Sequence, residues 1–147
     1  MKLVIQRVKE ARLSVDGSLV SEIKNGLCIY VGVEQGDVEA SATHLATKVS
    51  MLRIFSDENG KMNRSVMDVG GEALVISQFT LLADTDHGNR PSYSQAEAPE
   101  RANFLYRYFG EELKRAGVKT VKYGVFGADM TIEQVNDGPV TIVMERK

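Results

Sequence analysis

The sequence predicts an α+β protein in which a mixed, mostly antiparallel sheet is covered by two helices. Two turn signals, Asp16-Gly17 and Asn25-Gly26, separate apolar segments near the start of the chain. Two later stretches have helical periodicity, and short apolar segments follow each of them. Strands joined by tight turns pair antiparallel, and helices placed between strands cover a face of the sheet.

The first part of the chain is expected to form three strands. Residues 3–8 and 11–15 are strand-like, and the chain returns through residues 19–23 after the first turn. The second turn leads into residues 27–33, which form a continuous apolar segment. Connections this short predict an antiparallel meander, in which each strand pairs with the next one.

The first helix is expected to begin after Asp37, which is a suitable N-cap residue. Its apolar residues recur on one face at helical spacing: Val38, Ala42, Leu45, Val49 and Leu52. His44 lies off this apolar face, so we expect it on the surface. Residues 54–55 resume a strand before a turn at residues 57–60, and residues 73–82 are expected to form a further buried strand.

The second half contains a long loop and the second helix. Residues 83–98 are polar and rich in turn formers, as in loops that carry function. Pro99 suits the first turn of the following helix, and Gly117 suits its end. The apolar face of this helix carries Leu105, Tyr108, Phe109, Leu113 and Ala116. Three short strands are expected to follow, at residues 118–123, 130–135 and 140–144.

Composition limits the classes of protein to which the chain can belong. Its 147 residues are most simply one domain, residues 1–147, with a net charge of −2. No apolar run reaches the length of about 20 residues that a membrane-spanning helix needs, and the first residues do not read as a signal peptide. The single cysteine, Cys28, lies in an apolar segment and is expected to be a buried thiol. A cytoplasmic location without a membrane partner is therefore the expectation.

The usual motifs of catalysis and metal binding are missing from the sequence. Its two histidines, His44 and His87, stand apart from each other, and no zinc motif, phosphate-binding glycine loop or dinucleotide fingerprint occurs. Scattered acidic residues do not make a metal site, so neither a metal nor a cofactor is expected. Hydrolysis by such a chain would rely on backbone donors, hydroxyl groups or the substrate itself.

Two segments carry the remaining chemical signals. Residues 77–81, Ser-Gln-Phe-Thr-Leu, place polar side chains in an apolar strand. They are either the wetter face of an ordinary strand or a pocket wall, where backbone N–H groups form an oxyanion hole and Thr80 supplies a hydroxyl. Residues 136–141 contain Gly138-Pro139. This pair either begins a strand or holds a cis peptide bond that orients the Gly138 carbonyl.

Taken together, these segments resemble the two signature motifs of the D-aminoacyl-tRNA deacylases. Further similar stretches run along nearly the whole chain, at residues 5–8, 53–57, 61–63, 83–85 and 88–93. The resemblance implies a layered β/β/α, barrel-like fold. It also implies a homodimeric hydrolase that cleaves the ester between a D-amino acid and the terminal adenosine at the 3′ end of tRNA.

The resemblance implies that a cis Gly138-Pro139 peptide reaches the pocket across the dimer interface. The Gly138 carbonyl would face the α-amino group of the substrate, and Pro139 would complete that wall. An L-residue would clash with this backbone, whereas a D-residue or glycine would not. Glycine mischarged on the alanine tRNA is then an unintended substrate. Asn136 is expected to belong to this wall, and Arg7 to orient it by hydrogen bonding.

The resemblance assigns Ser77, Gln78, Phe79 and Thr80 to the catalytic wall. Backbone N–H groups of Phe79 and Thr80 would hold the scissile carbonyl. Thr80 would then attack it, or the ribose 2′-hydroxyl of the substrate would help to activate water. Because no base is oriented beside Thr80 in the sequence, we favour the substrate-assisted route.

The chain departs from the family pattern at Asp86-His87, where a more basic pair is expected, and at Tyr93, where Phe is commoner. The basic candidates for contacts with tRNA phosphates are Lys61, Arg64, Arg90, Arg101, Lys114, Arg115, Lys119 and Lys122. Two other functions stay open. One is a non-catalytic dimer that binds nucleotides or RNA ends, and the other is a hydrolase of another aminoacyl ester or amide that uses Thr80 as nucleophile.

Overall fold

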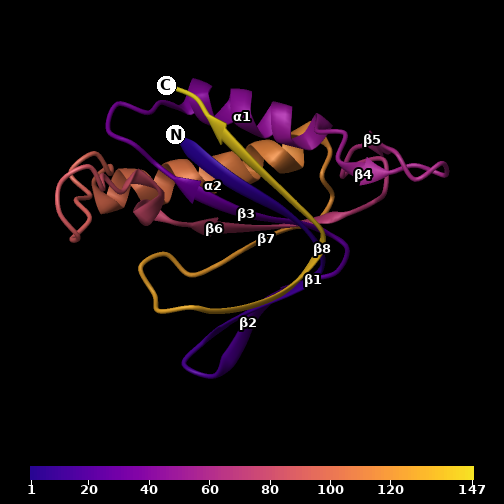
Figure 1. The fold of residues 1–147 in the computed structure, drawn as a ribbon, viewed down its shortest axis with the longest axis horizontal. Coiled ribbons are helices and arrows are strands. Elements are labelled where there is room, and N and C mark those ends of the chain that lie inside the picture. The colour runs from indigo at the N-terminus through magenta and orange to yellow at the C-terminus, as the bar shows by residue number, and fades with distance from the viewer.

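The computed structural model describes residues 1–147 and shows a strongly curled sheet with two helices against one face (Figure 1). The elements in chain order are β1 (Lys2–Val15), β2 (Ser18–Ile23), β3 (Gly26–Gly32), α1 (Glu39–Met51), β4 (Phe55–Ser56), β5 (Met62–Arg64), β6 (Glu72–Ser77), the 3-10 turn η1 (Phe79–Leu82), α2 (Pro99–Ala116), β7 (Val121–Tyr123) and β8 (Thr131–Glu145). The predicted α+β class, with a mixed barrel-like sheet and two covering helices, is confirmed.

The long strand β1 organises the main sheet. The strand order is β2-β1-β3-β6-β7, and β8 pairs with the other edge of β1. The predicted meander is wrong, because β2 and β3 both pair with β1 and not with each other. Residues 2–8 of β1 pair with β3 and residues 11–15 pair with β2, so the strand is long enough to hold two partners along one edge. The pairs β3–β6 and β6–β7 are parallel.

Two predicted boundaries also differ from the structure. The buried strand expected over residues 73–82 ends at Ser77, and η1 follows it. Its neighbour β3 ends at Gly32, and beyond that point the chain bonds to itself, with the Leu81 N–H donating to the Gln78 carbonyl. The two strands expected at residues 130–135 and 140–144 are one continuous strand, β8, because β1 offers it a partner on both sides of the Gly138-Pro139 pair.

The side chains of the sheet divide between two apolar clusters. Along β3, Leu27, Ile29 and Val31 face the helices and join the larger cluster, while Cys28 joins the smaller one on the opposite face. Burial raises the pKa of the Cys28 thiol to about 11, so it is protonated at neutral pH. The predictions of a buried Cys28 and an exposed His44 are confirmed.

Asp37 does not cap α1, contrary to the prediction. The N-cap residue is Val38, and no side chain caps the first turn. The Asp37 carboxylate is buried and accepts hydrogen bonds from the Met1 ammonium at 2.6 Å and from the Glu34 N–H at 2.7 Å. The carboxylate is therefore used to neutralise the buried amino group at the start of β1, which ties that strand to the segment before α1.

Replacing Asp37 with Asn is expected to lower the free energy of unfolding by about 3 kcal/mol, because the buried ammonium group loses its counter-charge. The asparagine oxygen can still accept a hydrogen bond, so the loss comes chiefly from charge. Urea denaturation measures the difference. Glu39→Gln is the matched control, because it breaks the solvent-exposed pair with Arg101 and should cost less than about 1 kcal/mol. Equal losses in the two variants would contradict the assignment.

Candidate active site

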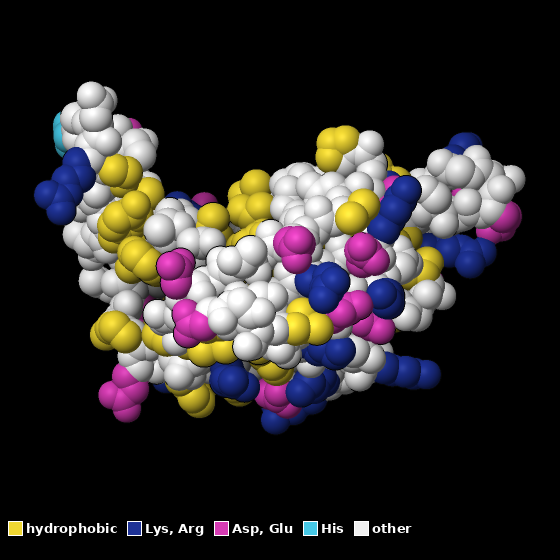
Figure 2. All heavy atoms as spheres, turned by 90° about the horizontal axis from the view of Figure 1, so that it is seen from below, with side chains coloured by type: hydrophobic (Ala, Val, Ile, Leu, Met, Phe, Trp, Pro, Cys, Tyr) yellow, Lys and Arg dark blue, Asp and Glu magenta, His cyan; other side chains and the backbone are white.

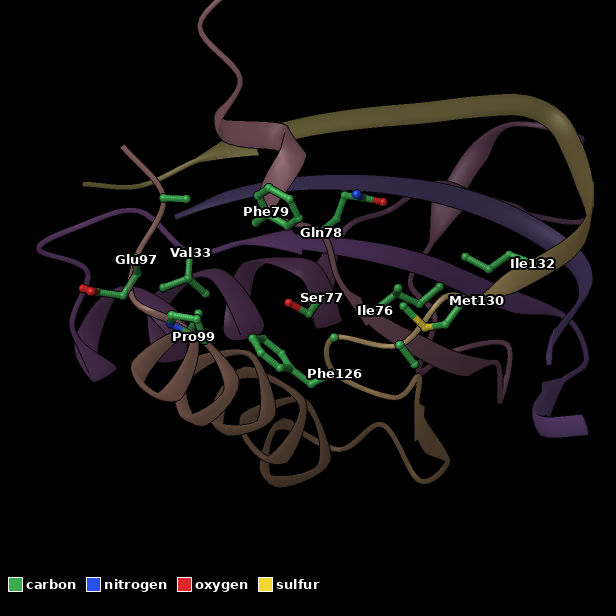
Figure 3. Close-up of a pocket in the computed structure, with 14 residues that line it drawn as sticks. Val33, Ile76, Ser77, Gln78, Phe79, Glu97, Pro99, Phe126, Met130 and Ile132 are labelled. Carbon is green, nitrogen blue, oxygen red and sulfur yellow. The ribbon is translucent and has the colours of Figure 1, made fainter. Parts of the chain in front are cut away.

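A cavity of about 560 Å³ opens where β6 ends, and most of its lining is apolar (Figure 3). Ser77, Gln78 and Phe79 form one side of it. The rest of the lining comes from the end of β3, the segment 96–99, the first turn of α2 and the segment 126–132. A cavity of this size accommodates a small organic ligand or a nucleoside.

Three of the residues predicted as the catalytic wall, Ser77, Gln78 and Phe79, line this cavity, whereas Thr80 follows them in η1 and is not part of the lining. The Gln78 side-chain amide donates a hydrogen bond to the Thr80 hydroxyl at 2.6 Å, and the Gln78 N–H donates to the Val31 carbonyl. The N–H groups of Phe79 and Thr80 open η1, and the first N–H groups of a helix have no acceptor within it. Thr80 is exposed, and its hydroxyl has no hydrogen bond to a histidine or carboxylate that would act as a base.

The segment 126–132 was missed by the sequence analysis, although it forms much of the cavity wall. Figure 3 shows Phe126 and Phe79 on opposite sides of Ser77, with Met130 and Ile132 further along the cavity. The Phe126 ring stacks on the buried ring of Tyr106, with 5.8 Å between the centroids. The only signal in the sequence was a pair of glycines, Gly124 and Gly127, in an apolar stretch without strand or helix periodicity.

The second predicted wall lies at an irregularity of β8. Gln6 pairs with Thr141 and Val8 with Asn136, so Arg7 alone stands opposite residues 137–140, here called the Gly-Pro corner. The Gly138-Pro139 peptide bond is cis, as expected, and Gly138 has a φ of +129°. An added Cβ at Gly138 would lie 2.8 Å from the Val140 nitrogen, so a side chain does not fit there.

The Arg7 side chain donates a hydrogen bond to the Gly-Pro corner, as predicted. Its Nε donates to the Asp137 carbonyl at 3.1 Å, and its terminal nitrogen donates to the Ile54 carbonyl at 2.6 Å. The Asp137 carboxylate lies 3.4 Å from the same Nε, and Arg7 is only 8% exposed. One buried guanidinium therefore joins β1, the Gly-Pro corner and the segment before β4.

The side chain of Asn136 belongs to a polar network beside this corner. Its oxygen accepts a hydrogen bond from the Gln134 amide at 2.6 Å. The same amide donates to Gln6 at 2.7 Å, and the Gln134 oxygen accepts from the Tyr30 hydroxyl at 3.0 Å. Burial is the main cause that raises the pKa of Tyr30, so this hydroxyl is a donor at neutral pH.

The two predicted walls do not meet within one chain. Arg7 pairs with Leu27, which pairs with Ala73, and Ser77 lies four residues further along β6. Four strand residues span about 13 Å. Gly138 and Pro139 are exposed and do not line the cavity. The sequence motifs therefore form two separate surfaces of this chain.

The remaining charged groups give the cavity no metal site. No group of three or more His, Cys, Asp or Glu side chains gathers anywhere in the structure. Neither helix is both long and apolar enough to cross a membrane.

Four of the eight basic candidates for phosphate contacts are already paired with glutamates: Arg64, Arg101, Lys114 and Arg115. Arg90 forms no ion pair and lies on the exposed loop beside the cavity.

The chain is similar to known proteins over almost its whole length. Residues 4–145 match the family described as D-Tyr-tRNA(Tyr) deacylase. The chain is 51% identical over 145 residues to the D-aminoacyl-tRNA deacylase of Rhodopirellula baltica, and the match covers 99% of each chain. It is 54% identical over 145 residues to the D-aminoacyl-tRNA deacylase of Cereibacter sphaeroides, with the same coverage of both chains.

A solved structure described as c-Myc DNA Unwinding Element Binding Protein superposes with a TM-score of 0.93 at 40% identity, covering 100% of this chain and 99% of the other. The matches to the family and to its relatives extend over almost the whole chain, including both residues 77–80 and the Gly-Pro corner. The chain therefore belongs to the D-Tyr-tRNA(Tyr) deacylase family.

Proposed function

We propose that the chain hydrolyses the ester of D-aminoacyl-tRNA, with the terminal adenosine in the cavity at the end of β6. The observation that carries this proposal is that three residues of the family motif, Ser77, Gln78 and Phe79, line a cavity of nucleoside size. Aromatic and apolar side chains line this cavity, and nucleobases stack well on such surfaces. The ester, which is attached to the ribose, would then lie at the mouth of the cavity, beside Ser77 and Thr80.

The reaction follows from the groups at this mouth. Water adds to the ester carbonyl carbon, and the N–H groups of Phe79 and Thr80 stabilise the developing oxyanion. The bond to the ribose 3′-oxygen then breaks, and that oxygen takes up the proton that the water gives away. Because Thr80 accepts a hydrogen bond from Gln78 and faces no base, the neighbouring ribose 2′-hydroxyl is the better proton carrier. The products are the free amino acid and tRNA.

The Gly-Pro corner is proposed to act on the cavity of a second copy of the chain. Its exposure and its separation from the cavity of its own chain support this homodimer, as do the exposed side chains of Val135 and Val143 on β8. The Gly138 carbonyl would accept a hydrogen bond from the α-ammonium group, and Pro139 would close the wall. An L side chain would then point into backbone, so L-residues are rejected while D-residues and glycine, including glycine on the alanine tRNA, are accepted.

The proposal predicts that the protein releases the amino acid from D-tyrosyl-tRNA and leaves L-tyrosyl-tRNA intact. Both esters are prepared on the same tRNA, and the release of labelled amino acid is followed at equal protein concentration. The spontaneous hydrolysis of each ester without protein is the control. Cleavage of both enantiomers at similar rates would point to an unselective esterase, which is the alternative function with Thr80 as nucleophile.

A second candidate, a non-catalytic module that binds nucleic acid, is favoured by one comparison. The solved structure at 40% identity is described as a protein that binds a DNA unwinding element. The same incubation separates this candidate from the proposal, because a pure binding protein would leave both esters intact.

A further inference from the structure

Two exposed aromatic rings form a pair at the rim of the cavity. Phe79 is 55% exposed and Tyr93 is 37% exposed, and their centroids lie 5.1 Å apart with the rings at 70° to each other. Phe79 also lines the cavity, whereas Tyr93 stands outside it on the long loop. Exposed aromatic surface beside a binding site commonly marks a contact with a ligand or partner.

The backbone that carries Tyr93 is fixed on both sides. Before it, Asp84 and Ser92 exchange two backbone hydrogen bonds of 2.8 and 2.9 Å. After it, the Gln35 N–H donates to the Gln95 carbonyl at 3.0 Å, which ties the loop to the end of β3. Figure 2 shows this loop as an arm at one end of the molecule, with apolar side chains gathered at its root. The Tyr93 ring is therefore presented in a set position, which lowers the cost of ordering it on binding.

The charges on the loop exclude a surface that attracts phosphate strongly. Asp84, Asp86 and Glu97 are negative, and Arg90 is the only lysine or arginine among residues 84–97. A surface of this charge cannot depend on the electrostatic attraction that dominates contacts with the nucleic-acid backbone. Its recognition chemistry is instead that of the flat aromatic faces, on which a nucleobase stacks without a charged group on the protein.

We propose that the Phe79–Tyr93 pair is a stacking platform for the nucleobase that precedes the terminal adenosine of the RNA. This inference rests on the proposed function, because it takes the last nucleotide to lie in the cavity. A strand whose last nucleotide fills the cavity must leave over its rim, and Phe79 belongs to both the cavity and the rim. The penultimate nucleotide is then the first one outside the cavity, so its base is the one that lies nearest the platform.

The test compares the binding of adenosine with that of the unacylated trinucleotide cytidylyl-cytidylyl-adenosine, measured by calorimetry. The wild-type protein should bind the trinucleotide at least about tenfold more tightly than adenosine. Tyr93→Leu keeps an apolar contact for Phe79 but removes the aromatic face, and it should abolish most of that gain. Tyr93→Phe should retain it. Tyr108→Leu is the matched control, because it alters another aromatic pair, exposed Phe104 and half-buried Tyr108, which does not line the cavity.

The outcomes separate this inference from the proposed function, because binding is measured without turnover. An equal loss of adenosine and trinucleotide binding in Tyr93→Leu would overturn the platform, since Tyr93 would then only position Phe79. A gain that persists in Tyr93→Leu, or one that disappears between 50 and 200 mM salt, would also overturn it. If the expected pattern appears while D-aminoacyl-tRNA stays intact, the platform stands and the hydrolytic function fails.

Discussion

A D-aminoacyl-tRNA whose terminal adenosine lacks the 2′-hydroxyl is expected to be hydrolysed at least about a hundredfold more slowly than the natural substrate. Proton transfer by a positioned group contributes about 10²–10⁴-fold to reaction rates, and this substrate lacks the group. The physical reason for this slower hydrolysis is that no base lies beside the Thr80 hydroxyl. Its hydroxyl is exposed, accepts a hydrogen bond from Gln78 and faces no base, so the protein offers no proton carrier at that position. The measurement is the single-turnover rate on tRNA ending in adenosine or in 2′-deoxyadenosine, with the D-amino acid on the 3′-oxygen of both.

The variant Thr80→Ala tests the alternative mechanism, in which the threonine hydroxyl is the nucleophile. If the substrate carries the proton, the variant should keep its rate within about tenfold of the wild type, because the proposed oxyanion donors are backbone N–H groups that the substitution leaves in place. Loss of all activity in Thr80→Ala, together with normal turnover of the 2′-deoxy substrate, would show that the threonine hydroxyl is the nucleophile.

Replacing Arg7 with Met is expected to destabilise the fold by about 2–4 kcal/mol, because it leaves two carbonyls without their donors in a largely buried site. These are the carbonyls of Asp137 and Ile54. The Gly-Pro corner would lose its only side-chain support from β1. Displacement of a substrate-positioning group by about 1 Å can cost about a hundredfold in rate. We therefore expect a loss of that order in hydrolysis of D-tyrosyl-tRNA, measured at a temperature at which the variant is folded.

Arg12→Met is the control for the loss of a guanidinium from the same strand. Arg12 is half-exposed and pairs with Glu22 at 3.7 Å, so its removal should cost less than about 1 kcal/mol and leave turnover unchanged. Chemical denaturation and the deacylation rate are measured on both variants. If Arg7→Met is folded and hydrolyses the D ester at the wild-type rate, Arg7 does not position the Gly-Pro corner for catalysis.

Local patterns were sufficient to predict most of the elements. The helical periodicity before Met51 and the Pro99 and Gly117 signals placed both helices to within a few residues. The same patterns misplaced the end of β6 and divided β8 into two strands, because the length of a strand depends on whether its neighbour continues. The pairing of β2 and β3 along a single edge of β1 likewise has no local signal.

The candidate site was predicted only in part, because some of its residues come together through contacts between distant segments. Residues 77–80 and 138–139 were identified by their residue types and by their resemblance to a family. The structure places Ser77, Gln78 and Phe79 at the cavity and residues 138–139 away from it. The segment 126–132 was missed because its role depends on packing, with Phe126 supported by Tyr106 from α2. Tyr93 was noted only as a departure from the family pattern, and its contact with Phe79 became visible in three dimensions.

Local sequence features were enough to predict the class of the fold, both helices and the two motifs of the site, because turn chemistry, periodicity and short motifs are properties of neighbouring residues. The ion pair of Asp37 with the Met1 ammonium and the contact of Arg7 with the Gly-Pro corner arise from tertiary packing and have no local signal in the sequence. Within one chain the two motifs lie apart, because β1 and β3 stand between the Gly-Pro corner on β8 and Ser77 on β6, and Ser77 is four residues further along the strands. These features join segments distant in sequence, where the burial of a polar group depends on which strand lies beside it.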